Sequence, residues 1–302
     1  MKKSVALVLS SGGSKGLAHI GVINELEKQG FKITSISGSS IGSVYGGLHA
    51  MGKLHEYTEW VKTLKPKSIW DLMDFTISTN GLLKGEKVFQ KMKTFIPDMP
   101  IEDLNIPFAA VATDLLNEVD VVFDSGSYYE AIRASIAIPS VFTPVKFKDT
   151  ILVDGGVLNP IPIEHVKRNK DDILVVVNLY GKKESNSINA DVIETNDQSS
   201  GNNLNGIFKS ISKFISSGDR RSLGYFSLLS TTTHAMVHKI AKQSIEKHQP
   251  DITISIPYDS SNTFDFHKAD KMIEMGEIAA RKAIMNYLNS DNHENISDNM
   301  RL

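Results

Sequence analysis

The sequence contains no cysteine among its 302 residues, so it can form neither disulfide bonds nor thiolate metal sites. It also lacks a strong charge of one sign, because its formal net charge is −2, and a basic surface for nucleic acid is therefore not expected. No apolar run approaches the length of a transmembrane helix, and we find no spacing typical of metal ligands. These properties fit a soluble cytoplasmic protein without a cofactor or a bound metal, although the lack of cysteine does not by itself fix the compartment.

Near the N-terminus, an apolar run at 5–9 is followed by a loop rich in glycine and serine at 10–16. The run has the length of a buried strand, and the residues after the loop have the periodicity of an amphipathic helix. Glycines leave backbone N–H groups open to an incoming oxygen, which suits a phosphate cradle or an oxyanion hole. Because the loop fits neither G-x-x-x-x-G-K-[ST] nor G-x-G-x-x-G, it favours an oxyanion hole. Its predicted donors are Gly12, Gly13 and Ser14.

A G-x-S-x-G motif places Ser40 between a predicted strand at 33–37 and a predicted helix at 41–51. Such an elbow presents the serine as a nucleophile at the end of a strand. The turn is sharp, so Gly38 and Gly42 avoid the clashes that a Cβ would cause there. The free N–H groups at the start of the helix favour a negative charge on the serine oxygen. Ser40 is therefore the predicted nucleophile.

Asp154 is the predicted partner of Ser40. It ends an apolar segment at 151–153 and is followed by Gly155 and Gly156, which turn the chain. Asp-Gly pairs are also common in surface turns. However, open α/β sheets collect catalytic groups at the carboxyl ends of their buried strands. We therefore expect Asp154 to lie at the same edge of the sheet as Ser40.

Together these segments resemble the patatin-like phospholipase family, in its bacterial branch of single-domain serine lipid hydrolases. The oxyanion signature of that family, G-G-G-x-R-G, lies on residues 11–16, its elbow on 38–42 and its D-G-[AG] element on 154–156. Two further segments, 111–115 and 131–139, resemble its A-T-D-L strand and its R-A-S-x-A-x-P segment. The likeness extends from near residue 4 to near residue 180.

Two residues depart from the oxyanion signature. Ser11 replaces its first glycine and Lys15 replaces its arginine, and a lysine cannot reproduce the planar fork of a guanidinium. The pair of glycines at 12 and 13 is kept, so backbone donors for an oxyanion are still expected. The residues expected to support the motifs are Lys15, Gly16, Gly38, Gly42, Gly155 and Gly156.

The resemblance implies a three-layer α/β/α domain with a mainly parallel central sheet. It also implies that Asp154 activates Ser40 directly, without histidine, and that the substrates are phospholipid or lysophospholipid esters. An ordinary aspartate, with a pKa near 3.9, is a weak base at neutral pH, so burial would have to raise the pKa of Asp154. We expect a serine lipid acyl hydrolase of the phospholipase A or lysophospholipase type.

Two alternatives remain open at this stage. An α/β-hydrolase triad would add a histidine to Ser40 and Asp154, in the chain order that such enzymes use. The second alternative is a protein that has the same fold and binds lipid but does not hydrolyse it. The candidates for the third triad member are His165, His234, His238 and His267.

The character of the sequence changes after the predicted catalytic core at 1–181. We expect 223–290 to form helices packed on the same domain, and 291–302 to form a polar tail. Between the core and these helices, 182–222 is a polar insertion that contains a predicted amphipathic helix at 204–216. Its lysines flank an apolar stripe, which suits a lid or an anchor on an anionic lipid surface, although a core helix shows the same periodicity. The stripe consists of Leu204, Ile207, Phe208, Ile211, Phe214 and Ile215.

Overall fold

The computed structural model describes residues 3–74, 83–183 and 225–299. The predicted amphipathic helix at 204–216, and with it the hypothesis of a lipid contact, lies outside the described residues. Within the three described ranges, no helix is both long enough and apolar enough to cross a membrane.

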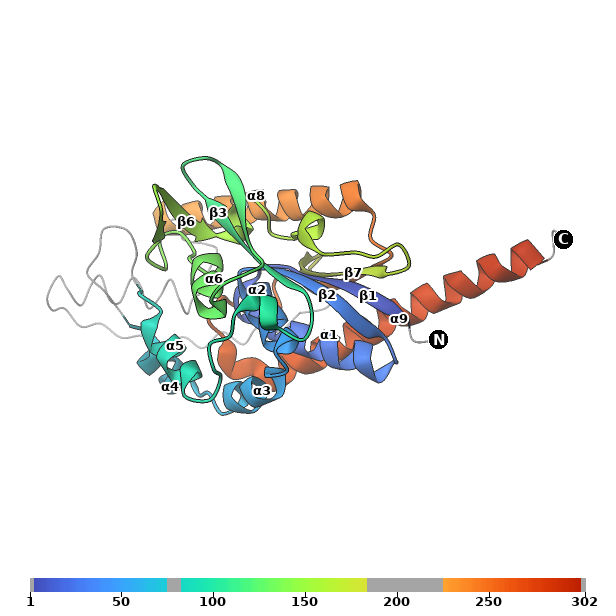
Figure 1. The fold of residues 1–302 in the computed structure, drawn as a ribbon, viewed down its shortest axis with the longest axis horizontal. Coiled ribbons are helices and arrows are strands. Elements are labelled where there is room, and N and C mark those ends of the chain that lie inside the picture. The colour runs from blue at the N-terminus through green and yellow to red at the C-terminus, as the bar shows by residue number, and fades with distance from the viewer. Residues whose placement is uncertain (1–2, 75–82, 184–224, 300–302) are drawn as a thin grey trace, which may run out of the picture.

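A central sheet organises the domain (Figure 1). Its strands are β1 (Ser4–Leu9), β2 (Lys32–Ser39), β3 (Phe108–Asp114), β4 (Val119–Phe123), β5 (Val145–Phe147), β6 (Thr150–Asp154), β7 (Ile173–Gly181) and β8 (Ile252–Pro257). They run in the order β5-β6-β3-β2-β1-β7-β8, and β4 pairs with β3 off this path. Four neighbouring pairs in this order are parallel: β3 with β2, β2 with β1, β1 with β7, and β7 with β8. Strands β4, β5 and β6 add antiparallel pairs at one side.

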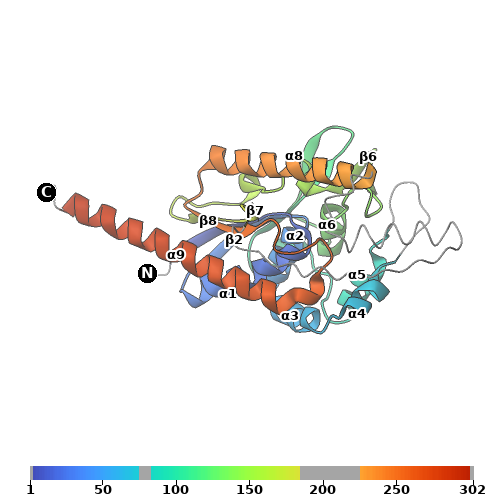
Figure 2. The ribbon, with the colours of Figure 1, turned by 180° about the vertical axis from the view of Figure 1, so that it is seen from behind.

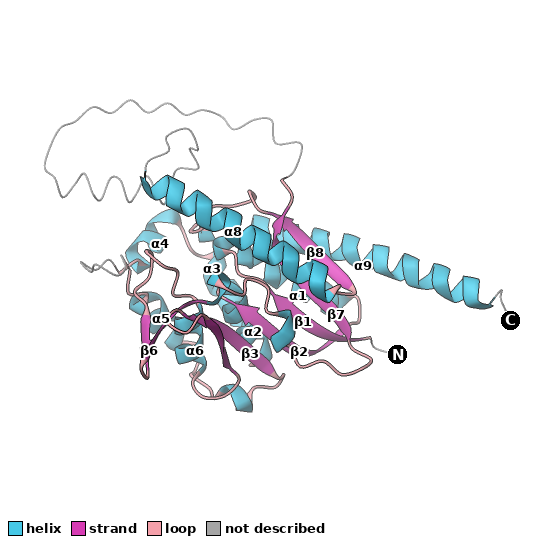
Figure 3. Ribbon diagram, turned by 90° about the horizontal axis from the view of Figure 1, so that it is seen from above, coloured by secondary structure: helices cyan, strands magenta, loops and turns pink. Residues whose placement is uncertain are grey.

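Helices cover both faces of the sheet. The described α-helices are α1 (Leu17–Lys28), α2 (Ile41–Ala50), α3 (Leu54–Lys62), α4 (Pro66–Leu72), α5 (Glu86–Lys93), α6 (Tyr128–Ser135), α8 (Tyr225–His248) and α9 (Ala269–Asn299). Helix α8 runs along one face, and α1 and α9 lie together on the other (Figures 1 and 2). Figure 3 looks onto α8, which passes over the β7 side of the sheet.

The side chains of β1 show why the fold has three layers. Successive residues of a strand point to opposite faces of the sheet. Val5, Leu7 and Leu9 belong to the large core under α1 and α9, whereas Ala6 and Val8 belong to a smaller core that includes residues of α8. Burial on both faces accounts for the continuous apolar run. The predicted three-layer α/β/α domain with a mainly parallel sheet is confirmed.

Helices α1 and α9 approach each other closely. A Cβ on Gly21 of α1 would lie 1.9 Å from the carbonyl oxygen of Ile273 in α9, so no side chain fits there. Arg281 of α9 donates two hydrogen bonds to the carboxylate of Glu25, with N···O distances of 3.1 and 3.0 Å. The C-terminal helix is therefore an integral part of the domain.

The C-terminal part was expected to be helical over 223–290, but it also contains strand β8. Ile252, Ile254 and Ile256 alternate with polar residues in this segment, which is the periodicity of a strand with one buried face. Strand β8 pairs in parallel with β7, so this part of the chain extends the same sheet.

Candidate active site

Ser40 lies at the turn between β2 and α2, where its backbone has φ 54° and ψ −124°. A positive φ is uncommon for a residue with a side chain, and such strain is typical of functional turns. The flanking glycines leave room for the turn, because a Cβ on Gly38 would lie 2.5 Å from the Gly42 carbonyl carbon. A Cβ on Gly42 would lie 2.2 Å from the carbonyl oxygen of Leu9. The predicted elbow is present, and the strained conformation belongs to Ser40 itself.

Two further serines hold the elbow in place. The N–H of Ser40 donates to Oγ of Ser135 at 2.9 Å, and the Ser135 hydroxyl donates to the carbonyl oxygen of Val111 at 2.6 Å. The hydroxyl of Ser43 donates to the carbonyl oxygen of Ser40 at 2.6 Å. These bonds satisfy buried backbone groups that would otherwise cost free energy. Ser135 therefore positions Ser40, a role that sequence analysis did not assign to it.

Asp154 ends β6 beside the elbow. The Ser40 hydroxyl donates a hydrogen bond to Oδ2 of Asp154, and the N–H of Gly156 donates to Oδ1 at 2.7 Å. Ser40 is 4% exposed and Asp154 is 5% exposed. Burial raises the pKa of Asp154 to about 7, although the hydrogen bonds from Ser40 and Gly156 oppose the rise. The carboxyl group thus has the basicity near neutral pH that a general base requires.

The remaining glycines of the motifs, Gly16, Gly155 and Gly156, lie where no side chain fits. A Cβ on Gly16 would come within 2.6 Å of the Ile41 side chain. A Cβ on Gly155 would lie 2.1 Å from a carbonyl oxygen of β3, and one on Gly156 would lie 2.6 Å from the Ser11 hydroxyl. Their absence of side chains lets the loop after Asp154 pack against β3 and the glycine loop at 10–16.

The glycine loop has two open donors. Among the described residues, no acceptor is bonded to the N–H groups of Gly12 and Gly13. The N–H of Ser14 instead donates to the carbonyl oxygen of Thr263 at 2.9 Å, and the Ser14 hydroxyl donates to the carbonyl oxygen of Asn262 at 2.5 Å. The predicted role of Ser14 as a third oxyanion donor therefore has no support in this geometry. Its N–H is already used to fix the loop.

Ser11 and Lys15, the two departures from the signature, both contact Tyr180 near the end of β7. Oγ of Ser11 lies 2.5 Å from the Tyr180 hydroxyl oxygen, and Nζ of Lys15 lies 5.5 Å from the centre of the Tyr180 ring. Nζ also donates to the carbonyl oxygen of Tyr258 at 3.1 Å. Desolvation lowers the pKa of Lys15 to about 8, and nearby Asp259 partly offsets this effect. Neither Tyr180 nor Tyr258 belongs to a motif, so the sequence alone does not indicate their contacts with the loop.

The described structure brings no histidine to Ser40 or Asp154, whose side chains bond to each other and to the Gly156 N–H. Nε2 of His165 lies 2.8 Å from Oδ2 of Asp120 instead. The ring of His238 lies 6.3 Å from the Tyr180 ring, measured between centroids. The alternative of a Ser-Asp-His triad has no support in this geometry.

The assembled groups have complementary chemical properties. The hydroxyl of Ser40 can attack a carbonyl carbon, and the Asp154 carboxylate can accept the proton that the hydroxyl loses. Backbone N–H groups without acceptors can stabilise the oxyanion that such an attack generates. Together they can carry out acyl transfer from an ester.

Comparisons with known proteins bear on this site. The family model described as patatin-like phospholipase matches residues 7–167. An uncharacterised NTE family protein of Mycobacterium tuberculosis is 31% identical, over 93% of this chain and 91% of that protein. Lysophospholipase NTE1 of Scheffersomyces stipitis is 24% identical, over 91% of this chain but only 17% of that longer protein. Among solved structures, VipD of Legionella pneumophila has a TM-score of 0.47 at 14% identity, covering 96% of this chain and 67% of that one.

Proposed function

The chain belongs to the patatin-like phospholipase family, and from that premise we propose that it is a serine lipid acyl hydrolase with a Ser40–Asp154 dyad. Membership of this family supports lipid hydrolysis in general. The observation that carries the finer proposal is the hydrogen bond from the strained Ser40 to the buried carboxyl group of Asp154. No other pair of groups at this edge of the sheet combines a nucleophile with a base of raised pKa in the described residues.

The first half of the reaction transfers the acyl group to the enzyme. Oγ of Ser40 attacks the ester carbonyl carbon while its proton passes to Oδ2 of Asp154. The N–H groups of Gly12 and Gly13 hold the negative oxygen of the tetrahedral intermediate. When the intermediate collapses, the bond to the alcohol breaks, and Asp154 returns the proton to the departing oxygen.

The second half releases the acyl group. A water molecule gives a proton to Asp154 and attacks the acyl carbon on Ser40. Collapse breaks the bond to Oγ, Ser40 regains its proton from Asp154, and a fatty acid leaves. Asp154 acts alternately as base and acid, which suits a carboxyl group with a pKa of about 7 at neutral pH.

We assign the substrate class as phospholipid or lysophospholipid esters. This rests on the family and on a relative named as a lysophospholipase. The chemistry of the dyad requires only an ester carbonyl, so the acyl chain and head group must be distinguished by the surfaces around the dyad.

Covalent labelling tests the proposal directly. A fluorophosphonate should label the wild-type protein on Ser40, and Ser40→Ala should abolish both labelling and the hydrolysis of short p-nitrophenyl esters. Ser125→Ala is a suitable control, because Ser125 is exposed and belongs to neither loop of the site. Turnover by a folded Ser40→Ala protein would contradict the mechanism. An unlabelled wild-type protein would favour lipid binding without hydrolysis.

A further inference from the structure

A second group of side chains meets outside the Ser40 site. Asp120 lies on β4, and Glu164 and His165 lie in a short helical turn at Ile163–His165. One donor atom from each lies within 4.8 Å of the other two, and Nε2 of His165 is 2.8 Å from Oδ2 of Asp120. We propose that these three side chains bind a divalent transition-metal ion with the ligand preferences of Zn²⁺.

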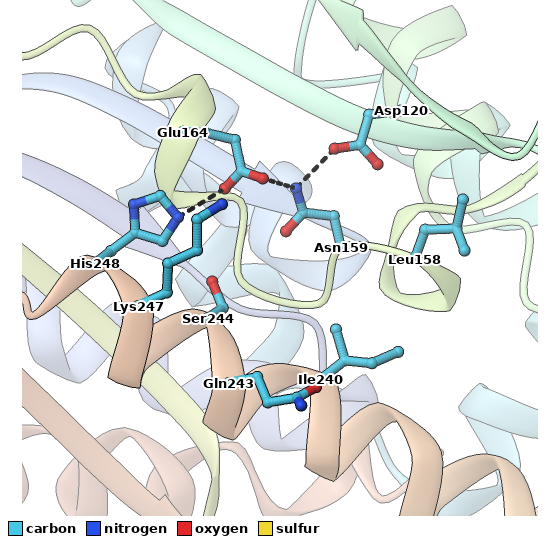
Figure 4. A pocket seen from close by; sticks show the side chains of 9 residues that line it. All are labelled: Asp120, Leu158, Asn159, Glu164, Ile240, Gln243, Ser244, Lys247 and His248. Atoms are coloured by element: carbon cyan, nitrogen blue, oxygen red, sulfur yellow. Dashed lines mark hydrogen bonds and ion pairs between the residues drawn. The ribbon is translucent and has the colours of Figure 1, made fainter.

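Asn159 holds the two carboxylates toward each other (Figure 4). Its amide nitrogen donates to Oδ2 of Asp120 at 2.7 Å and to Oε1 of Glu164 at 3.1 Å. Asn159 is 6% exposed, and its backbone N–H donates to the carbonyl oxygen of Gly155 at 2.8 Å. Two carboxylates repel each other at short range. A buried neutral amide that keeps them together therefore prearranges a site for a cation, as outer hydrogen bonds do in metal sites.

A hollow of about 220 Å³ lies beside these carboxylates. One wall carries Asp120, Asn159 and Glu164, and α8 supplies the opposite wall (Figure 4). His165 does not line this hollow, so the ion would lie at its edge, between Asp120 and His165, with water ligands in the hollow. Nε2 of His248, on α8, lies 3.8 Å from Oε2 of Glu164 and is a further nitrogen donor. Lys247 is the one ammonium on the walls, so the two carboxylates exceed the fixed positive charge.

The ligand types decide which ion is expected. Mg²⁺ and Ca²⁺ prefer ligand sets made of oxygen atoms, whereas an imidazole together with carboxylates suits Zn²⁺. On binding, Zn²⁺ would displace the proton between His165 and Asp120 to solvent, and Glu164 would turn inward as a third ligand. Glu164 can make this movement, because its side chain is 42% exposed. No metal-ligand spacing marks this site in the sequence, because Asp120 comes from a strand far from the other two ligands in the chain.

The proposal is independent of hydrolysis by Ser40, since it concerns other residues and a different test. Calorimetric titration of the chelator-treated 302-residue chain with Zn²⁺ should show one site per chain, with weaker binding of Mg²⁺. Asp120→Asn, His165→Ala and Glu164→Gln should each abolish that site. Asn159→Ala should weaken it by about 10- to 100-fold, as expected for a residue that orients ligands.

Two controls keep the test decisive. Asp124→Asn removes an exposed carboxylate just after β4, and His55→Ala removes an exposed imidazole elsewhere, so both should bind Zn²⁺ as the wild type does. Glu164→Gln should fold normally because of its exposure, and circular dichroism verifies this. The proposal is overturned if the wild type shows no saturable Zn²⁺ binding. It is equally overturned if folded Glu164→Gln binds Zn²⁺ with unchanged affinity.

Discussion

Replacing Asp154 by asparagine should remove activity and, at alkaline pH, stabilise the fold. The two effects have one origin, because the burial that makes the carboxyl group a base also makes its charge unfavourable. Burial raises the pKa of Asp154 from an ordinary 3.8 to about 7. Asparagine has a similar shape but neither accepts a proton nor carries a charge, so it loses the catalytic function and the desolvation cost together.

The magnitude follows from proton linkage. Between the two pKa values, the folded protein keeps the Asp154 proton while the unfolded chain has released it. The unfolded state therefore binds fewer protons, and the free energy of unfolding falls as pH rises. Taking 1.36 kcal/mol per pKa unit, this one group lowers the stability by about 2.5 kcal/mol between pH 5 and pH 8. The free energy of unfolding of Asp154→Asn should not show this decrease.

Urea denaturation of both proteins at pH 5 and pH 8 measures this effect. The stability of Asp154→Asn relative to wild type should increase by about 2.5 kcal/mol between these pH values. The poorer hydrogen bond to the Gly156 N–H affects both pH values alike and cancels. Hydrolysis of p-nitrophenyl esters should be lost in the variant, and wild-type activity should rise with pH through about 7. A stability difference that does not change with pH would refute the raised pKa and the reasoning built on it.

Three other predictions concern neighbouring features. Gly21→Ala should lower the free energy of unfolding by about 3 kcal/mol or more, because the new Cβ overlaps α9. Gly30 has a positive φ but lies in open space, so Gly30→Ala should lower the free energy of unfolding by only about 1–2 kcal/mol in the same urea assay. Alanine at each of the four candidate triad histidines should keep kcat/KM within about tenfold, or 1.4 kcal/mol; a loss of several orders of magnitude at one of them would restore the triad. Tyr180→Phe removes the partner of Ser11 and should lower kcat about tenfold through a misplaced glycine loop; an unchanged kcat would show that this contact has no role in positioning.

The sequence was sufficient to predict residues that belong to motifs. It was insufficient to predict the residues outside the motifs that hydrogen-bond to them. The motifs were enough to assign Ser40 and Asp154 to one site, but the expected reason, a shared carboxyl edge of parallel strands, does not apply: β6 runs antiparallel to β3, which separates it from β2. The hydrogen bond from the Ser14 N–H to Thr263 could not be predicted, because Thr263 is distant in the chain and has no motif of its own. Ser135 was passed over for a similar reason, since its contact with the Ser40 N–H arises only from tertiary packing.

The anchoring of the glycine loop has a consequence for how this enzyme fold can be divided. The family model covers residues 7–167 and includes Ser40 and Asp154, yet the loop at 10–16 is tied by Ser14 to Thr263 and by Lys15 to Tyr258. A chimaera that exchanges only the matched segment between two relatives would transfer Ser40 and Asp154 without the residues that shape the glycine loop at 10–16. The smallest interchangeable unit is therefore larger than the recognisable motif region, and it must extend through the residues that follow β8.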